Sequence, residues 1–184
     1  MKKQCLSTAA LAALLATGSL ALCTTAEAAS LKIPMSAVSA SGVDKPIGTV
    51  TATETTNGVE LMPTLADLPP GPHGFHVHDK PSCAAAPDPS KGGATAAGFG
   101  AGGHYDPAQS GKHEGPEGMG HKGDLPALTV DAKGMATATV IAPHLKLADL
   151  AGRSLMIHAG GDNYSDQPEK LGGGGARIAC GVIP

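Results

Sequence analysis

Residues 104–124 read HYDPAQSGKHEGPEGMGHKGD, and this stretch decides how the rest of the chain is interpreted. It contains three histidines and five glycines but almost no apolar residues. Neither a helical nor an alternating hydrophobic period fits it, so the pattern predicts a loop. A loop of this length inside a compact domain is usually either functional or disordered. The fold must therefore be built from the segments on either side of it.

The loop also offers the ligands of a zinc site. His104, His113, His121 and Asp124 supply three imidazoles and a carboxylate, a set that suits tetrahedral zinc. A bound ion would explain how so glycine-rich a segment could be ordered. The gaps between these residues are wider than those of a compact zinc finger, so a solvated loop with scattered histidines is the alternative interpretation.

The first residues have the pattern of an export signal. Lys2 and Lys3 precede an apolar run over residues 6–22, and residues 26–28 (AEA) form a small-x-small cleavage site. We expect cleavage after Ala28, which leaves a mature chain of residues 29–184.

A lipoprotein is the competing interpretation of the same region, with Cys23 as the acylated residue. Leu22 argues against it, because the residue before a lipidated cysteine is normally small. No other segment is apolar for long enough to span a bilayer. The mature protein is therefore predicted to be soluble and exported, without stable membrane association unless Cys23 is lipidated.

Length and charge limit the class of protein. The mature length fits one domain with a single core. The whole chain has a net charge of −3, and residues 1–28 contribute +1 through Lys2, Lys3 and Glu27, so the mature chain carries −4. This mild acidity argues against nucleic acid as a partner. It does not exclude a small anion, which responds to the local field of a cleft.

Two cysteines remain after removal of the signal, Cys83 and Cys180. In an oxidising compartment a lone pair most simply forms one disulfide. Zinc binding through cysteine is the weaker alternative, because neither residue belongs to a CxxC motif.

The remaining chain is rich in short β-strand signals. Strands are predicted at residues 31–40, 47–54, 59–65, 73–78, 125–130, 135–141, 154–158 and 178–183, with a short helical turn at 145–150. No regular element is predicted over residues 79–124, and residues 160–175 form a second long loop. About eight short strands with turn signals and little helix predict an all-β antiparallel sandwich or barrel. Its core must be made of aliphatic residues and Met, because the chain has no Trp.

A second group of histidines lies on the predicted strand at 73–78. Residues two apart on a strand share a face, so Phe75 and Val77 should point into the core while His76 and His78 point together to the other side. Two such imidazoles are about 7 Å apart along the strand and can share one ion. The alternative is a pair of exposed histidines on a polar face.

Three further histidines stand apart from these groups. His158 ends an apolar run beside the glycine-rich loop and is a plausible additional ligand. His73 is expected to pack or to form hydrogen bonds within its loop. His144 follows a proline in a connecting segment and is expected to lie on the surface.

Several motifs together resemble those of a known family. The segments are residues 74–78 (GFHVH), 102–104 (GGH), 123–126 (GDLP) and 175–182 (GARIACGV). In this order they resemble the copper–zinc superoxide dismutases. Residues 156–166 (MIHAGGDNYSD) and the glycine run at 172–175 look like the bacterial periplasmic branch. The resemblance covers essentially all of the mature chain, and the set of motifs is highly specific.

The resemblance implies a fold and two metal sites. The fold would be an eight-stranded antiparallel Greek-key β-barrel with two long functional loops, in a periplasmic protein. Each subunit would bind one copper ion and one zinc ion. The implied copper ligands are His76, His78, His104 and His158, and the implied zinc ligands are His104, His113, His121 and Asp124. His104 would be the imidazolate shared by the two metals.

Other residues take roles from the same resemblance. Asp162 matches an aspartate that links a copper histidine to a zinc histidine and so orients both. Cys83 and Cys180 match the intrachain disulfide, and Arg177 matches the active-site arginine. With Cys83 five residues after His78 and Cys180 three after Arg177, the disulfide is expected to hold the arginine strand near the copper strand.

The implied activity is the dismutation of superoxide to dioxygen and hydrogen peroxide. Four imidazoles suit copper(II), and only copper can change oxidation state, so the redox step belongs to the all-histidine site. By the same resemblance, the bond between copper and His104 is expected to break when copper is reduced, and His104 is then expected to take up a proton. Arg177 would attract the anion. Loop lysines that could steer superoxide are Lys80, Lys91, Lys112 and Lys170.

The residues leave a second class of function open. A non-catalytic copper- and zinc-binding protein, or a copper carrier on the same fold, could keep every ligand but would have no use for Arg177. A monomer and a homodimer are both compatible with the sequence.

Overall fold

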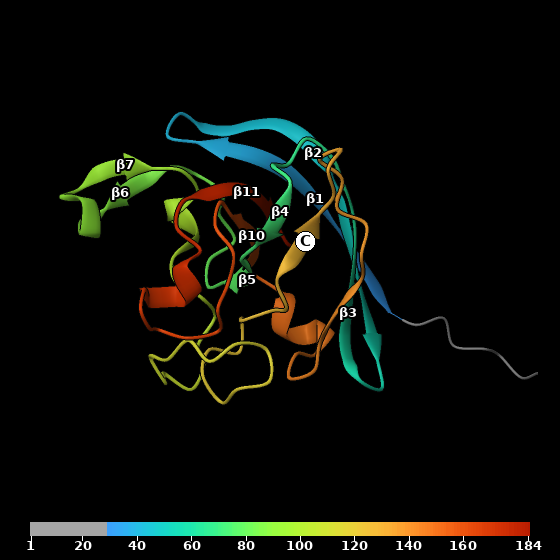
Figure 1. Ribbon diagram of the computed structural model, residues 1–184. Coiled ribbons are helices and arrows are strands. Elements are labelled where there is room, and N and C mark those ends of the chain that lie inside the picture. Colours follow the sequence, from blue (N-terminus) through green and yellow to red (C-terminus); the bar gives the residue numbers. More distant parts are fainter. Residues whose placement is uncertain (1–28) are drawn as a thin grey trace, which may run out of the picture.

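The computed structural model describes residues 29–184, and the predicted signal peptide, with Cys23, lies outside them. Within the described residues, no helix is both long and apolar enough to cross a membrane. This part of the chain folds almost entirely into short strands and connecting loops (Figure 1).

The described residues contain eleven strands and four short 3-10 helices. The strands are β1 (Ser30–Ser39), β2 (Gly42–Thr55), β3 (Gly58–Leu65), β4 (Gly71–His73), β5 (Phe75–His78), β6 (Ala86–Asp88), β7 (Ala94–Ala96), β8 (Leu128–Val130), β9 (Val140–Ala142), β10 (Ser154–His158) and β11 (Arg177–Val182). The 3-10 helices are η1 (Pro89–Lys91), η2 (Phe99–Ala101), η3 (Leu147–Leu150) and η4 (Lys170–Gly173).

Seven of the strands form one curled antiparallel sheet. Their order is β5-β10-β11-β1-β2-β3-β9, while β4 pairs with β8 and β6 pairs with β7 in two small sheets. The last strand therefore returns beside the first, where Ser36 pairs with Cys180. The prediction of an all-β antiparallel fold is confirmed.

The predicted strands at 73–78 and 135–141 differ most from those in the structure. The segment 73–78 divides at Gly74, because β4 pairs with β8 while β5 pairs with β10. Gly74 itself exchanges hydrogen bonds with the second long loop and with β10, through Gly160 O (2.8 Å) and His158 N (2.8 Å). The predicted strand at 135–141 is reduced to β9, although Ala136 still bridges to Leu65.

The prediction that residues 79–124 lack regular structure is wrong for part of that range. It contains β6, η1, β7 and η2, four elements of three residues each. Elements of three residues are too short to show a hydrophobic period in the sequence, and β6 and β7 pair only with each other. The strands β6 and β7, with η1 between them, project from one end of the sheet as a separate hairpin (Figure 1).

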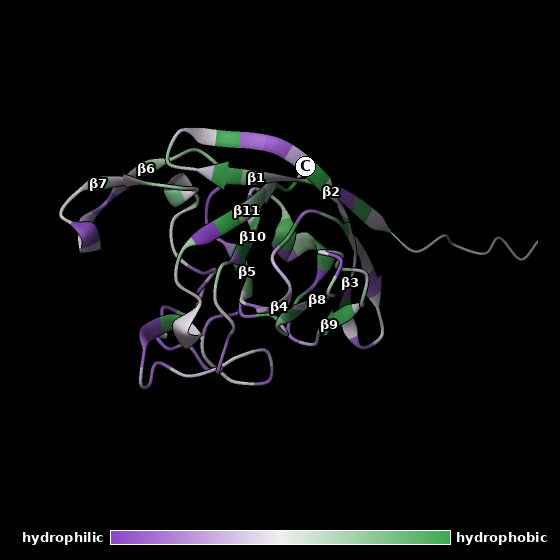
Figure 2. Ribbon diagram, turned by 45° about the horizontal axis from the view of Figure 1, so that its top comes forward, coloured by the Kyte–Doolittle hydropathy of each residue, from purple (hydrophilic) through white to green (hydrophobic). Residues whose placement is uncertain are grey.

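The core lies inside the curled sheet and follows the alternation predicted for β5. Phe75 and Val77 are fully buried in a cluster with Leu125, Leu155 and Ile157. Apolar positions accordingly concentrate on the strands and polar positions on the loops (Figure 2). His76 and His78 point to the opposite face but are also fully buried, so the alternative of two exposed histidines is excluded.

Both ends of the loop 104–124 attach to the free edge of β5. Val77 accepts a hydrogen bond from Tyr105 N (2.8 Å) and donates one to Gly123 O (2.9 Å), and Gly123 N donates to Tyr105 O (2.9 Å). Bridges between His78 and His104 and between His76 and Asp124 continue this pairing. The first and last residues of the loop are thereby placed beside the two histidines of β5.

Cys83 and Cys180 form the disulfide, with their Cα atoms 5.7 Å apart. It joins β11 to the segment that follows β5. Because β10 lies between β5 and β11, strand pairing already brings Arg177 to the histidines, opposite His158. The disulfide adds to this pairing, and the carbonyl of Ala84 beside Cys83 accepts a hydrogen bond from Gly100 N of η2 (2.9 Å). The carbonyl groups on either side of η2 hold Arg177, as described below.

Gly123 and Gly103 provide a matched test of the joint between the loop and β5. A Cβ on Gly123 would overlap Val77 O and lie 2.9 Å from Tyr105 N, whereas a Cβ on Gly103 would have nothing within 4 Å. Each glycine precedes one predicted ligand. We expect Gly123→Ala to lower the free energy of unfolding by about 1–3 kcal/mol, as overpacking does, and Gly103→Ala to change it little. Chemical denaturation of both variants measures this, and equal stabilities would contradict the role given to the joint.

Candidate metal centre

Four histidines from three segments converge on one buried point. His76 and His78 come from β5, His158 from the end of β10, and His104 from the start of the loop. One ring nitrogen from each lies within 4.8 Å of the others. All four side chains are buried, because the loops 104–124 and 160–175 cover the face of β5 that carries no core residues. The structure thus brings together the whole predicted copper set.

Contacts on the outer side of these rings determine which nitrogen faces inward. His78 Nδ1 donates to Gly102 O (3.0 Å) and His158 Nδ1 donates to Gly175 O (3.2 Å). Their Nε2 atoms then face each other at 3.4 Å with free lone pairs. Two facing acceptors repel each other unless a cation lies between them.

A second set of ligands surrounds Asp124. The Nδ1 atoms of His104, His113 and His121 lie 2.8, 2.9 and 3.4 Å from its carboxylate oxygens. The structure therefore also brings together the predicted zinc set. His104 belongs to both sets, with Nε2 toward the copper ligands and Nδ1 toward Asp124.

His76 is close to this second set as well. One ligand atom each from His76, His104, His113 and Asp124 lies within 4.8 Å of the others, a group that has His76 in place of His121. However, His76 Nε2 is already bound to Asp162 at 2.8 Å. The remaining nitrogen, His76 Nδ1, is unpaired but belongs to the all-histidine set, whereas His121 Nδ1 is also unpaired and has no place in that set, which favours the predicted zinc set.

Unpaired buried atoms indicate that the site is built for cations. Among the described residues, five of the six buried side-chain polar atoms without a hydrogen-bond partner belong to these ligands. They are His76 Nδ1, His104 Nε2, His113 Nδ1, His121 Nδ1 and Asp124 Oδ2. Leaving such atoms unpaired is costly in a folded protein. Copper at the all-histidine set and zinc at the carboxylate set would satisfy all five, so the residues fit these metals.

The all-histidine set is held in the uncharged form. Burial lowers the pKa of His104 to about 3, and neighbouring His76 adds to the effect. Burial likewise lowers the pKa of His76, His78 and His158. Neutral imidazoles are the form that binds a metal.

The histidines around Asp124 behave in the opposite way. Burial alone would lower the pKa of His113, but the carboxylates of Asp124 and Asp162 outweigh it and raise the pKa to about 9. Asp124 also raises the pKa of His121. Burial opposes ionisation of Asp124, yet the three histidines hold its pKa well below the usual range. Before metal binds, this set therefore carries positive charge as protons on its histidines.

Asp162 connects the two sets from the outside. Its buried carboxylate accepts hydrogen bonds from His76 Nε2 and His113 Nε2, both at 2.8 Å. One residue of each set is thus oriented by the same side chain. This is the position that the sequence resemblance assigned to Asp162.

Arg177 lies at the entrance to the all-histidine set. A cavity of about 330 Å³ is lined by His104, His158 and Arg177 together with Lys91 and Lys170. The guanidinium donates to Gly98 O (2.7 Å) and Gly102 O (2.6 Å), and its Cζ lies 4.7 Å from the centre of the Phe99 ring. The guanidinium is thereby held in place at the mouth of the cavity. Lys80 and Lys112 are not among the lining residues of this cavity.

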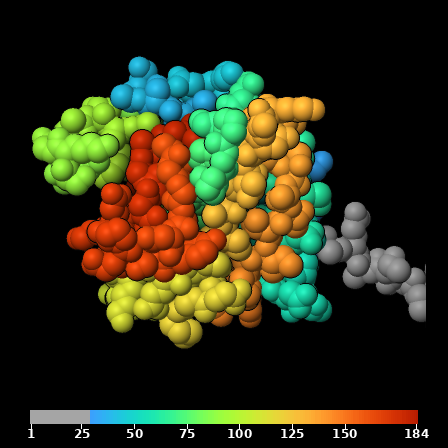
Figure 3. Space-filling view, viewed as in Figure 1, coloured from blue at the N-terminus to red at the C-terminus, as the bar shows by residue number. Residues whose placement is uncertain are grey.

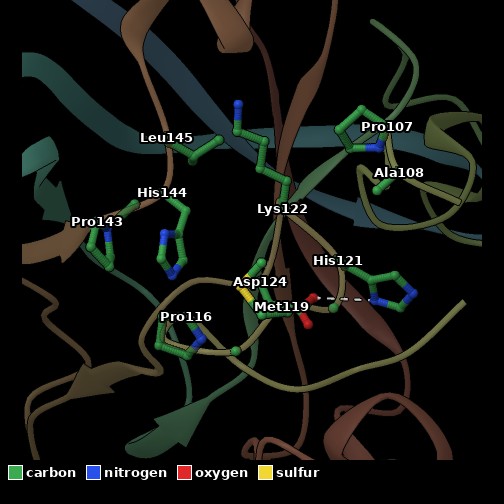
Figure 4. A pocket seen from close by; sticks show the side chains of 13 residues that line it. Pro107, Ala108, Pro116, Met119, His121, Lys122, Asp124, Pro143, His144 and Leu145 are labelled. Atoms are coloured by element: carbon green, nitrogen blue, oxygen red, sulfur yellow. Dashed lines mark ion pairs between the residues drawn. The ribbon is translucent and has the colours of Figure 1, made fainter. Parts of the chain in front are cut away.

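The two histidines predicted to lie outside the metal sites do so. His73 is buried between two carbonyl oxygens, 2.7 Å from His158 O and 2.7 Å from Pro69 O. His144 is exposed and lines a separate cavity of about 220 Å³ behind the zinc set (Figure 4). Met119 and His121 line the same cavity.

Sequence reasoning missed several supporting residues. Phe99 beside Arg177 has no signal in the sequence, since it stands in a glycine-rich segment without a period. Asp166 accepts from His113 N (2.9 Å), and Tyr164 accepts from Ala127 N (2.9 Å). Both residues lie within the quoted motif at 156–166, but their partners are distant in the chain.

Comparisons with known proteins agree with this geometry. Residues 46–183 match the family described as Copper/zinc superoxide dismutase (SODC). The superoxide dismutase [Cu-Zn] of Escherichia coli K12 is 56% identical over 165 residues, which cover 89% of this chain and 94% of that protein.

Two solved structures are also similar. The Cu/Zn superoxide dismutase from Brucella abortus matches with a TM-score of 0.82 and 50% identity, over 85% of this chain and 100% of that one. The monomeric copper, zinc superoxide dismutase from Salmonella enterica matches with a TM-score of 0.75 and 54% identity, over the same shares.

The contrast in pKa predicts proton release on zinc binding. Zinc requires a neutral His113, which is protonated at pH 7 because its pKa is about 9. Adding zinc to metal-free protein at pH 7 should therefore release about one proton or more, and fewer as the pH rises above 9. Calorimetry in buffers of different ionisation enthalpy measures this number. A His113→Gln variant should release correspondingly fewer protons, and equal release by both proteins would contradict the assignment.

Proposed function

Because the chain belongs to the family of copper/zinc superoxide dismutases, we propose that it converts superoxide to dioxygen and hydrogen peroxide at this centre. One superoxide gives up an electron and leaves as dioxygen. A second takes up that electron and two protons and leaves as hydrogen peroxide. Copper supplies the one-electron redox couple for this exchange, whereas zinc does not change its oxidation state.

The observation that carries the proposal is the double attachment of His104. Its Nε2 faces the all-histidine set without a partner, while its Nδ1 lies 2.8 Å from Asp124 in the other set. A single imidazole can bind two cations only when both nitrogens are directed in this way. We assign copper to His76, His78, His104 and His158, and zinc to His104, His113, His121 and Asp124.

His104 is also the residue suited to move a proton. Its Nε2 faces the all-histidine set and stands beside the substrate cavity, which His104 itself lines. We assign to this atom the uptake of a proton and its transfer to the second superoxide. The zinc ligands hold the ring in place from the Nδ1 side while this occurs.

Arg177 supplies the positive charge that a diatomic anion needs. The guanidinium faces the same cavity as His104 and His158, so an anion entering there meets a hydrogen-bond donor beside the copper set. Burial lowers the pKa of Arg177, but only to about 10, so it stays charged at neutral pH. Lys91 and Lys170 also line the cavity and add positive charge, part of which Asp88 offsets through its ion pair with Lys91.

The same proposal covers processing, location and assembly. We propose that residues 1–28 are removed as a signal peptide and that residues 29–184 act in the periplasm. A relative from Salmonella enterica is described as monomeric. In this chain every ligand of both sets comes from a single copy, so one subunit is sufficient for the centre.

A non-catalytic copper carrier is the competing function. A carrier needs the ligands but has no need of a guanidinium held by two carbonyl groups at the cavity mouth. Metal analysis of the purified protein, together with a dismutation assay after copper loading, separates the two functions. A copper-loaded protein without dismutase activity would favour the carrier.

Replacing His104 tests the shared ligand. We expect His104→Ala to reduce dismutation by about 100-fold or more, since it removes a ligand of both metals and the proton-transfer group. His144→Ala is the matched control, because His144 is exposed and belongs to neither set. Assays on metal-loaded proteins measure the effect. Unchanged turnover in His104→Ala would refute the two-metal assignment.

Replacing Arg177 tests the attraction of the anion. Arg177→Ile should lower the rate about 10-fold or more at low ionic strength and flatten its dependence on salt, because the local charge is lost. Lys45→Gln is the control of equal charge change, since Lys45 pairs with Asp67 in an exposed ion pair. Rates measured over a range of salt concentrations give both effects. An ionic-strength profile of Arg177→Ile equal to that of the wild type would exclude this role.

A further inference from the structure

Two loops that are distant in the sequence lie against each other at the metal centre. Residues 160–175 and residues 104–124 form adjoining layers on one face of the molecule (Figure 3). Three alternate residues of the 160–175 loop, Asp162, Tyr164 and Asp166, contact the 104–124 loop or the residues just after it. Asp162 and Asp166 both reach His113, through the ring Nε2 (2.8 Å) and the backbone N (2.9 Å).

Tyr164 joins three segments at once. Its ring lies on the backbone of Gly115, where an added Cβ would be 2.7 Å from Tyr164 Cβ and Cγ. Its hydroxyl accepts a hydrogen bond from Ala127 N (2.9 Å). Its backbone N donates to Asp162 Oδ1 (2.8 Å), the oxygen that also accepts from His113. The side chain thus spans both sides of the zinc ligands, before His121 and after Asp124.

The backbone of Tyr164 is unusual for so bulky a residue. Its φ is +58°, in the left-handed region that residues other than Gly and Asn seldom occupy. Burial does not account for this, since the residue is 40% exposed. The loop is braced from within, because Asn163 N donates to Gly172 O (3.1 Å) and Gly172 N donates to Ser165 O (3.0 Å). The conformation directs the ring onto Gly115 and the N–H onto Asp162.

We propose that Tyr164 is a positioning residue that closes the zinc set and retains the zinc ion. The inference rests on the proposed zinc ligands and adds a residue outside them. The ring limits outward movement of the segment between His113 and His121, and the hydroxyl holds the chain that leaves Asp124. Neither contact involves His76, His78 or His158, and the backbone N–H that binds Asp162, the partner of His76, remains in every Tyr164 variant, so copper should be retained.

Two variants separate the ring from the hydroxyl. Tyr164→Phe keeps the ring on Gly115 and loses only the acceptor for Ala127 N. Tyr164→Asn loses the hydroxyl and the ring beyond Cγ but keeps a residue that tolerates the left-handed backbone. In the copper- and zinc-loaded protein, zinc transfer to an excess of chelator should be about 3-fold faster in Tyr164→Phe and about 10-fold or more faster in Tyr164→Asn. Copper transfer should stay within about 2-fold of the wild type in both.

A spectroscopic readout and a control exclude a general loss of stability. The copper absorption spectrum of each loaded variant should match the wild type until zinc has left. Met62→Ala is the control, because Met62 is a comparably exposed residue on β3, outside both loops. A double-mutant cycle adds a direct test of contact: Gly115→Ala should accelerate zinc loss less in a Tyr164→Gly background than in the wild type, because Gly lacks the Cβ and Cγ that the added methyl group would meet.

The possible outcomes are distinct. Faster zinc transfer with unchanged copper transfer supports the positioning role. Unchanged zinc transfer in both Tyr164 variants, or equal acceleration of zinc and copper, overturns it while the zinc assignment stands. A wild-type protein that retains no zinc overturns the proposed zinc set and this inference together.

Discussion

The structure depends on the hydrogen bonding of Val77 at the free edge of β5. Its carbonyl accepts from Tyr105 N and its N–H donates to Gly123 O, so the two ends of a glycine-rich loop meet on one residue. The alternation of β5 then does two things at once. Phe75 and Val77 complete the core, and His76 and His78 are placed against His104 and Asp124. A single residue of register shift would exchange these faces and lose both.

The two ligand sets that result differ in charge, although they share His104. Burial without a nearby carboxylate keeps His78 and His158 neutral, whereas Asp124 and Asp162 raise the pKa of His113 to about 9. The all-histidine set suits a redox-active cation near an anionic substrate. The carboxylate set suits a cation that stays in place. The positions of Asp124 and Asp162 thus distinguish the redox site from the supporting site.

Support continues outward in a second layer of loop contacts. Asp162 bridges the sets, Gly98 and Gly102 hold Arg177, and the disulfide ties β11 to Cys83, next to Ala84, whose carbonyl binds Gly100 N. Tyr164 closes the layer over the zinc ligands. Each of these contacts joins residues far apart in the sequence, and none adds a metal ligand. Their common effect is that flexible, glycine-rich loops are ordered around a small number of buried polar atoms.

By itself the sequence determined the all-β class, the orientation of the histidines on β5 and the chemical types of both ligand sets, because alternation and residue chemistry are local properties. The count of two cysteines in the mature chain already predicted one disulfide, and the motif resemblance extended the prediction to Asp162 and Arg177. Only the tertiary structure decided that residues 73–78 divide at Gly74, that residues 86–101 form short elements, and that Phe99 and Tyr164 support the site. These features arise from contacts between distant segments, whose partners leave no period or spacing in the chain. The pattern of residues thus specifies what can bind, and the packing of the loops specifies how it is held.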